Sequence, residues 1–245
     1  MDHPATDATS ISLVIPAYNE EKRLGNQTRV FEYIRSNFQT VEFLYVDDGS
    51  TDGTYLRLLD YQKENPEVKI LRHARNLGKG KAVRTGMEAA TGDLILFSDV
   101  DFSTPIEEIQ KLLPFIRTGF DIAFGSRGVP GSNVEIHQSL LRQVTGKIGN
   151  VIVQTLLLLP YTDTQCGFKL YRADALKKIL PRLTVDGFAF DMEMLAVASV
   201  QGLKAVEVPV TWRNVLDSRV RAIHNLEVLR DVLRIRYQMA MGDYS

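Results

Sequence analysis

Short apolar runs alternate with longer stretches of mixed polarity through the first half of the chain, and this alternation limits the possible folds more than any other feature. The apolar runs predict strands at 11–16, 42–47, 68–72, 93–98 and 121–126. The stretches between them predict helices at 20–37, 52–64, 79–91 and 105–118. Strands that alternate with helices form a mainly parallel sheet with helices on both faces. We therefore expect an α/β fold built on a Rossmann-like sheet.

The second half of the chain is less regular. It predicts a helical stretch at 136–159, strands at 167–171 and 205–212, and helices at 173–180, 190–201 and 223–241. No linker and no shift in composition divides the chain, so we expect one domain over 11–241. Residues 1–10 are polar and lack the apolar core of a signal peptide, and we expect them to form a disordered tail.

Two carboxylates stand at the end of one predicted strand. Asp99 and Asp101 follow the apolar run 94–98 and form a D-x-D pattern. In open α/β sheets ligands bind at the carboxyl ends of the strands. Two hard oxygen ligands there suit Mg2+ or Mn2+, which takes its other ligands from water and a phosphorylated substrate. A helix N-cap before Pro105 is the simpler interpretation, but a cap needs only one of the two residues.

Two further strands deliver polar loops to the same edge. The run 42–46 leads into Asp47 and Asp48, and the run 11–16 leads into a loop that contains Glu20. A turn rich in Asp, Gly and Ser is the simpler interpretation of 47–53. It becomes weaker once the three strands are taken as neighbours. The glycine patterns of dinucleotide folds and of P-loops are missing, so any nucleotide is bound in another way.

Composition excludes several classes of protein. The 245 residues carry a net charge of −1, which gives no global case for nucleic-acid binding. A single cysteine, Cys166, excludes an internal disulfide and a cysteine zinc site, and it is consistent with a reducing compartment. The longest apolar stretch, 151–159, is shorter than the roughly 20 residues that span a bilayer. His73, His137 and His224 show no metal-ligand spacing, and we expect them to be ordinary residues.

Four motifs together resemble one enzyme family. The segments 14–20, 46–54 and 75–80, with the D-x-D pattern, are similar to the motifs of the inverting GT-A glycosyltransferases of family 2. The segment 163–169, and Arg213 followed by Ser218 and Arg219, resemble the branch that uses polyprenyl phosphates. That branch often has Lys where Arg219 stands, and the charge is kept. The resemblance covers about 11–237 and implies a donor half at 11–126 and an acceptor half at 127–241.

The resemblance implies roles on the donor side. Pro16, Tyr18 and Glu20 in the first loop, together with Asp48, would hold the base and ribose, for which carboxylates are suitable acceptors. Lys79 would lie near the diphosphate or uracil. Asp99 and Asp101 would hold Mg2+ or Mn2+, with Ser103 at the periphery. The metal would neutralise the leaving diphosphate.

The acceptor side calls for cations, because a polyprenyl phosphate is already an anion. By resemblance, Arg127 and Arg142 would contact the acceptor phosphate, and Arg213, Ser218 and Arg219 belong to a loop that closes over the donor diphosphate. Asp191 and Glu193 do not share a helix face, so we expect only one of them at the site. We favour Asp191, which would orient the sugar or pair with an arginine.

These roles imply an inverting transfer of hexose from a nucleotide sugar to a polyprenyl phosphate. The segment 163–169 favours UDP-glucose, and GDP-mannose stays open. The arginines between 213 and 236 and the apolar run 151–159 suit peripheral attachment to the cytoplasmic face of a membrane. A homo-oligomer is left open. The rival interpretations are a family 2 enzyme that uses a sugar or lipid hydroxyl, a non-catalytic nucleotide-sugar-binding module and a receiver-like signalling domain.

Overall fold

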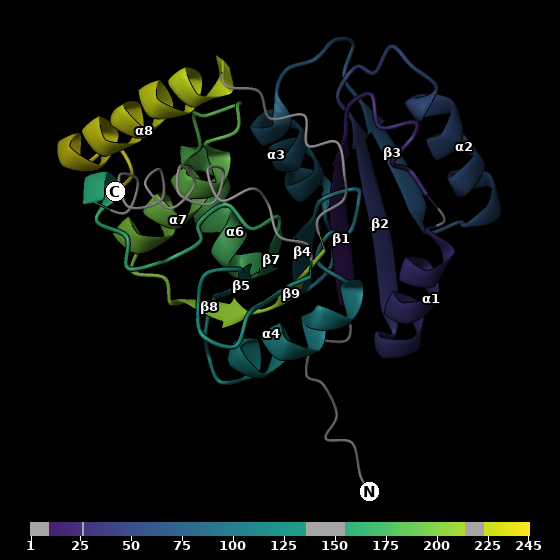
Figure 1. The fold of residues 1–245 in the computed structure, drawn as a ribbon, viewed down its shortest axis with the longest axis horizontal. Coiled ribbons are helices and arrows are strands. Elements are labelled where there is room, and N and C mark those ends of the chain that lie inside the picture. Colours follow the sequence, from purple (N-terminus) through teal and green to yellow (C-terminus); the bar gives the residue numbers. More distant parts are fainter. Residues whose placement is uncertain (1–9, 26, 136–154, 214–222) are drawn as a thin grey trace, which may run out of the picture.

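A seven-stranded sheet runs through the centre of the computed structural model, which describes residues 10–25, 27–135, 155–213 and 223–245 (Figure 1). In spatial order its strands are β3 (Val68–Arg72), β2 (Thr40–Asp47), β1 (Ser10–Ala17), β4 (Leu94–Ser98), β7 (Phe168–Arg172), β5 (Ile122–Ser126) and β8 (Ala205–Pro209). Only β7 is antiparallel to its neighbours. The expected mainly parallel sheet is confirmed.

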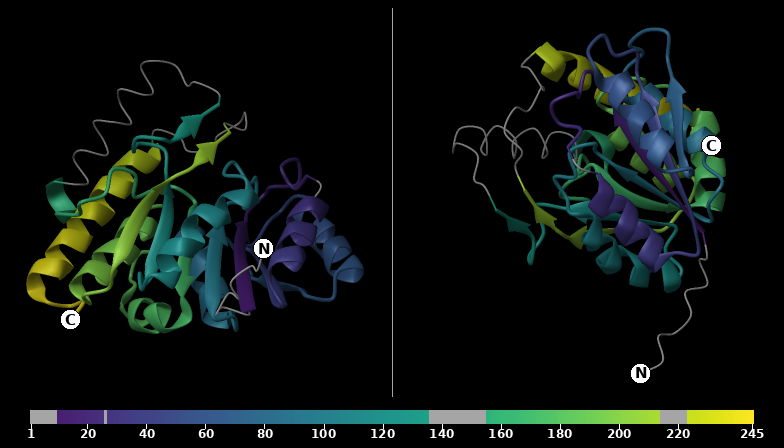
Figure 2. Two further views of the ribbon diagram at one scale, coloured as in Figure 1. Left: turned by 90° about the horizontal axis from the view of Figure 1, so that it is seen from below. Right: turned by 90° about the vertical axis from the view of Figure 1, so that its right-hand side faces the viewer.

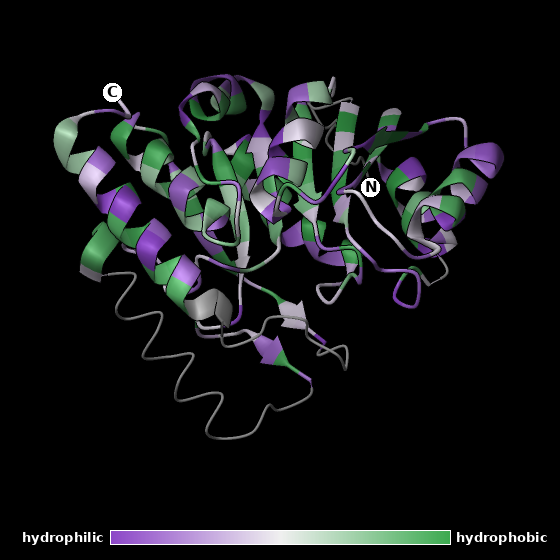
Figure 3. Cartoon of the chain, turned by 90° about the horizontal axis from the view of Figure 1, so that it is seen from above, coloured by the Kyte–Doolittle hydropathy of each residue, from purple (hydrophilic) through white to green (hydrophobic). Residues whose placement is uncertain are grey.

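Helices cover both faces of this sheet. One face packs against α1 (Thr28–Asn37), α2 (Thr54–Glu64) and α4 (Ile109–Arg117), and the other against α3 (Lys79–Ala89), α6 (Ala173–Ile179) and α7 (Phe190–Val200) (Figures 1 and 2). On this second side α8 (Ile223–Met241) packs on α7. Alternate residues of β1 supply the two cores, with Leu13 on the first face and Val14 on the second. Figure 3 shows hydrophobic residues concentrated on the central strands.

The topology brings the predicted polar loops to one edge. β2, β1 and β4 are parallel neighbours, so the loops after Asp47, Ala17 and Ser98 begin side by side. β7 runs in the opposite direction, and Ser98 pairs with Phe168 at the start of β7. The segment that precedes β7 therefore reaches the same edge as the D-x-D pattern.

Two predicted elements differ from the structure. The helix expected from residue 20 begins at Thr28, because 20–25 form a turn in which Arg23 and Leu24 donate backbone hydrogen bonds to the Glu20 carbonyl. The strand expected over 205–212 is divided. β8 ends at Pro209, and β9 (Thr211–Trp212) pairs with β6 (Asn133–Val134) in a separate two-stranded sheet. Most of the expected helix 136–159 and residues 1–9 of the expected tail lie outside the described residues.

Candidate active site

The two D-x-D carboxylates lie directly beyond β4, and each has a cationic partner. The ammonium nitrogen of Lys79 is 2.6 Å from Asp99 Oδ1. Asp101 Oδ1 accepts hydrogen bonds from the Ser103 N–H at 3.0 Å and the Ser103 hydroxyl at 2.8 Å, while Asp101 Oδ2 contacts the Arg23 guanidinium. Neither carboxylate caps the helical turn at 106–108, so the capping interpretation is wrong. The cluster joins β4, α3 and the first loop.

Local backbone geometry fixes both carboxylates. Phe102 has φ 45°, in the left-handed region that a bulky residue rarely adopts, and this turn brings Ser103 back over Asp101. The Asp99 N–H donates to the Gly167 carbonyl at 3.1 Å. A Cβ at residue 167 would overlap the Asp99 carboxylate. Glycine is therefore required at this position of the segment before β7.

The first and second loops form one hydrogen-bonded unit. The Asn19 N–H donates to Ser50 Oγ at 2.9 Å, Asn19 Oδ1 accepts from the Thr51 N–H at 2.8 Å, and the Glu20 N–H donates to Thr54 Oγ1 at 2.7 Å. Pro16 is buried at the end of β1, and the side chain of Tyr18 is exposed at the sheet edge. The structure thus brings Tyr18 and Glu20 to the edge that holds the D-x-D pattern.

Asp48 organises the loop in front of α3. Its buried carboxylate accepts the N–H groups of Leu77 and Gly78, both at 2.9 Å, and lies 2.7 Å from His73 Nδ1. The other ring nitrogen of His73 lies 3.1 Å from Thr85 Oγ1. His73 thus links Asp48 to α3, a structural contact that the sequence did not predict. A contact of Asp48 with base and ribose stays a prediction.

Lys79 is held in an acidic and aromatic setting at the start of α3. Its ammonium lies 5.5 Å from the centre of the Phe97 ring and 5.9 Å from that of Phe190. Burial acts to lower the pKa of Lys79, but the carboxylates of Asp99, Asp191 and Asp101 outweigh it and raise that pKa. Lys79 therefore keeps its positive charge at the sheet edge.

A buried ion pair lies beside this cluster. The ammonium of Lys169, which is fully buried in β7, is 2.6 Å from Asp191 Oδ1 in the first turn of α7 and also donates to the Cys166 carbonyl at 2.5 Å. Burial raises the pKa of Asp191, although Lys169 and Lys79 act against this shift. Sequence reasoning did not single out Lys169. The position of Lys169 between the apolar residues Phe168 and Leu170 was the available signal, because a buried charge requires a partner.

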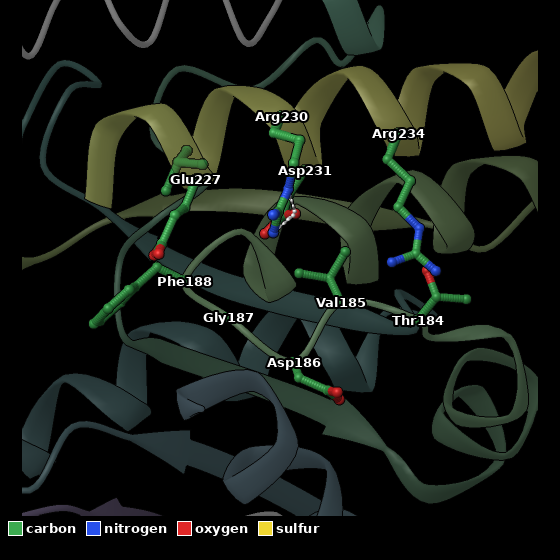
Figure 4. A pocket seen from close by; sticks show the side chains of 10 residues that line it. Thr184, Val185, Asp186, Gly187, Phe188, Glu227, Arg230, Asp231 and Arg234 are labelled. Atoms are coloured by element: carbon green, nitrogen blue, oxygen red, sulfur yellow. Dashed lines mark hydrogen bonds and ion pairs between the residues drawn. The ribbon is translucent and has the colours of Figure 1, made fainter. Parts of the chain in front are cut away.

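Glu193 faces away from this cluster. Its carboxylate accepts the N–H groups of Thr184 and Val185 and the Tyr244 hydroxyl, all at 2.8–3.0 Å. Of the two acids in α7, Asp191 therefore lies with Lys79 and Asp99. A pocket of about 270 Å³ opens between the 184–188 loop and α8, where Arg230 pairs with Asp231 (Figure 4). It contains none of the D-x-D residues.

Two of the predicted acceptor-side arginines, Arg127 and Arg213, pair with carboxylates of the chain. Arg127 donates two hydrogen bonds to Asp163, from Nε at 2.6 Å and from Nη2 at 2.8 Å. Arg213 Nε lies 2.8 Å from Glu135 Oε2. Burial would raise the pKa of Asp163, but Arg127 outweighs burial and lowers it. The Arg213 N–H donates to the Ser103 carbonyl at 2.7 Å, which places residue 213 next to the D-x-D loop. Arg142, Ser218 and Arg219 lie outside the described residues.

A Rossmann-like sheet with a D-x-D pair at its carboxyl edge defines the class of protein. The chain belongs to family 2 of the glycosyl transferases, whose family model, "Glycosyl transferase family 2", matches residues 12–180. It is 33% identical to a dolichyl-phosphate beta-glucosyltransferase from Trichomonas vaginalis, over 96% of this chain and 75% of that protein. The Saccharomyces cerevisiae dolichyl-phosphate beta-glucosyltransferase is 30% identical over 99% of this chain and 79% of its own length.

Solved structures confirm the fold. Glucosyl-3-phosphoglycerate synthase from Mycobacterium tuberculosis superposes with a TM-score of 0.69, over 94% of this chain and 80% of that one, at 18% identity. A structure of that enzyme with Mn2+, UDP-glucose and phosphoglyceric acid gives the same TM-score at 19% identity, over 94% of this chain and 79% of that one. At this level of identity the likeness shows the GT-A fold alone. No helix in the described parts of the chain is long and apolar enough to cross a membrane.

Proposed function

We propose that this glycosyltransferase transfers glucose from UDP-glucose to a polyprenyl phosphate of the dolichyl-phosphate type, with inversion at the anomeric carbon. The observation that carries the proposal is the edge where Asp99, Asp101 and Lys79 meet, in a chain whose relatives are named for glucosyl transfer to dolichyl phosphate. In this proposal 11–126 binds the donor and 127–241 binds the acceptor. Pro16, Tyr18, Glu20 and Asp48 belong to the nucleoside side of the site.

A divalent metal fits the donor set. Asp99 and Asp101 supply hard oxygen ligands, and the Asp99 side chain is 36% exposed. Among the described residues no cluster of three His, Cys, Asp or Glu side chains could hold a metal alone, so the diphosphate and water would complete the coordination of Mg2+ or Mn2+. When bound, the metal would neutralise charge on the leaving diphosphate. Ser103 would act indirectly, since it orients Asp101.

The chain's own residues supply the remaining chemistry. Lys79 remains charged and can contact the diphosphate. Asp191, held at 2.6 Å by Lys169, can accept hydrogen bonds from sugar hydroxyls and fix the sugar in the orientation needed for attack from the opposite face. A phosphate nucleophile needs no strong general base. Arg127 and Arg142 are proposed to position that phosphate, and Arg213, Ser218 and Arg219 to close over the donor.

We propose attachment to the cytoplasmic face of a membrane through the outward face of α8. This face carries the exposed apolar residues Leu226, Leu229, Leu233, Tyr237 and Met241. Exposed Arg230 and Arg234 border it, while Val232 and Ile235 on the opposite face are buried. An apolar stripe with basic borders complements an anionic lipid surface. It would bring the site to the bilayer where a polyprenyl phosphate resides.

Identification of the product tests this function. The protein would be incubated with Mn2+ or Mg2+, a panel of nucleotide sugars and a polyprenyl phosphate, and the lipid product analysed by mass spectrometry and NMR. We expect glucosyl phosphate lipid with a β linkage from UDP-glucose, and none in excess chelator. Asp101→Asn, with retained folding, is the negative control. Equal rates with a free polyprenol would favour a hydroxyl acceptor instead.

A further inference from the structure

Both D-x-D carboxylates are already neutralised by cations from the chain itself. Lys79 contacts Asp99 Oδ1, and the Arg23 guanidinium contacts Asp101 Oδ2 and also lies 3.2 Å from Glu20 Oε1. The other oxygen of Asp101 is engaged by the Ser103 N–H and hydroxyl. Asp101 Oδ2 is thus the oxygen left for a metal, and Arg23 is in contact with it.

We propose that Arg23 is an internal counter-ion of the metal site, which a divalent metal must displace before Asp101 can bind it. The guanidinium released from Asp101 is received by the nucleotide diphosphate, so metal and nucleotide bind cooperatively. The inference rests on the proposed function, because it takes Asp99 and Asp101 as the metal ligands. It adds a residue from the first loop that no sequence motif singled out.

The contacts of Arg23 favour an exchangeable role. Its side chain is 19% exposed, and its Nε–H is buried without a hydrogen-bond partner in the described structure. An unsatisfied buried N–H is costly, so the observed position is not the best that a guanidinium can reach. Arg binds phosphate through two parallel hydrogen bonds, which are stronger than neutral ones. A diphosphate at the sheet edge therefore offers Arg23 a more complete set of acceptors.

Electrostatics gives the sign of the effect. A positive guanidinium on Asp101 Oδ2 repels a second cation and occupies the same oxygen, so it weakens metal binding to the free protein. When Arg23 moves from Asp101 to the diphosphate, Asp101 Oδ2 becomes available and the repulsion from the guanidinium is removed, so the metal binds more tightly. Cooperativity between two ligands is reciprocal, so metal must also strengthen nucleotide binding by the same factor.

Titration of Mn2+ followed by electron paramagnetic resonance, with and without UDP, tests the proposal without measuring catalysis. We expect Arg23→Gln to bind Mn2+ about tenfold more tightly than the natural protein in the absence of UDP, and the enhancement by UDP to fall by about the same factor. Arg23→Lys keeps a positive charge and should stay near the natural values. Arg29→Gln is the matched control, since exposed Arg29 pairs with Glu107 away from the cluster.

The outcomes separate the two proposals. Unchanged or weaker Mn2+ binding by Arg23→Gln, in a protein that still binds Mn2+, would overturn the role of Arg23 and leave the metal site standing. If the natural protein bound no Mn2+ with or without UDP, the assignment of Asp99 and Asp101 as metal ligands would be wrong. The proposed role of Arg23 as a counter-ion would then be wrong as well. Thermal unfolding of each variant shows whether it is folded. If Arg23→Gln does not fold, unequal Mn2+ binding by Arg23→Lys and the natural protein would overturn the charge argument.

Discussion

The position of a single carboxylate depends on the absence of one methyl group. Gly167 lies against Asp99. The absence of a Cβ leaves room for the Asp99 carboxylate, and the Gly167 carbonyl accepts a hydrogen bond from the Asp99 N–H. The neighbour that a new Cβ would meet is the far end of the half-buried Asp99 side chain, which can rotate away without moving the backbone. Gly167 is thus more important for the direction of Asp99 than for folding.

Replacing Gly167 with alanine should separate these effects. We expect Gly167→Ala to lose at least about 100-fold in kcat, because the displaced Asp99 can no longer hold the metal in place. The free energy of unfolding should change by less than about 1 kcal/mol. Gly25→Ala, at a glycine with open space around it, should leave both values unchanged. A stable and fully active Gly167→Ala protein would contradict the role given to Asp99.

Several of the residues that the structure brings together at the sheet edge could be predicted to lie there, because they are charged residues at predictable strand or helix ends. Asp99 follows β4, Lys79 begins α3 and Asp191 lies in the first turn of α7. Arg23 and His73 could not, because their contacts join segments far apart in the sequence and no spacing pattern announces them.

At the scale of elements, carboxylates hold the segment that leads into β7. Between 159 and 167 the chain has no regular structure, and its backbone needs side-chain partners. Glu207 of β8 accepts the N–H groups of Thr162 and Asp163 and the hydroxyl of Ser126. Asp163 in turn accepts from the N–H and guanidinium of Arg127, just after β5. Two acids thus place Gly167 against β4.

The pH dependence of stability should reveal the Asp163 contact. Its pKa is lowered in the folded protein, so its stabilising effect is present above the pKa of the unfolded chain and is lost as the pH falls through the lowered value. Asp163→Asn should lower the free energy of unfolding by about 3 kcal/mol at pH 7, measured in urea, and the difference should shrink in strong acid.

Asp174→Asn provides the matched comparison. Asp174 is largely exposed and lies 3.6 Å from Arg172, so its loss should cost less than about 0.5 kcal/mol at any pH. A loss for Asp163→Asn that is equally large at pH 7 and in strong acid would show that packing, rather than charge, holds the segment.

The type of an element, helix or strand, could be predicted where the hydrophobic periodicity was strong. Its boundaries could not be predicted where polar contacts override that periodicity. The stretch 20–37 has helical periodicity, yet Glu20 and Arg23 are drawn into contacts with Thr54 and Asp101, so α1 starts only at Thr28. The antiparallel direction of β7 was equally hidden. Sequence patterns report that a strand is buried, but they do not report which neighbour it joins.

On the scale of the whole molecule, α8 packs across α7 at one end of the molecule (Figure 2). Five of its apolar residues are exposed, namely Leu226, Leu229, Leu233, Tyr237 and Met241. We expect the protein to float with vesicles that contain anionic lipid and far less with neutral ones. A double variant, Leu226→Glu with Leu233→Glu, should bind at least about tenfold more weakly, because each leucine would contribute about 1.5–3 kcal/mol on burial.

Leu56→Glu is the control for this experiment, since Leu56 is an exposed leucine on α2. Glucosyl transfer to a short, water-soluble polyprenyl phosphate should be unchanged in all three proteins, which separates membrane attachment from catalysis. Equal flotation of the double variant and the natural protein would exclude the α8 face as the attachment surface.

The antiparallel strand also determines when the molecule can be completed during synthesis. Among the strands that the structure describes, β5 pairs with β7 and β8, so none of its partners is made before it. The first 126 residues can therefore assemble only β3, β2, β1 and β4, and closing the sheet requires contacts between positions as distant as 94 and 172. Such non-local pairing forms late. A nascent chain that already carries Asp99 and Asp101 can place them beside Lys169 and Asp191 only after residue 191 has left the ribosome.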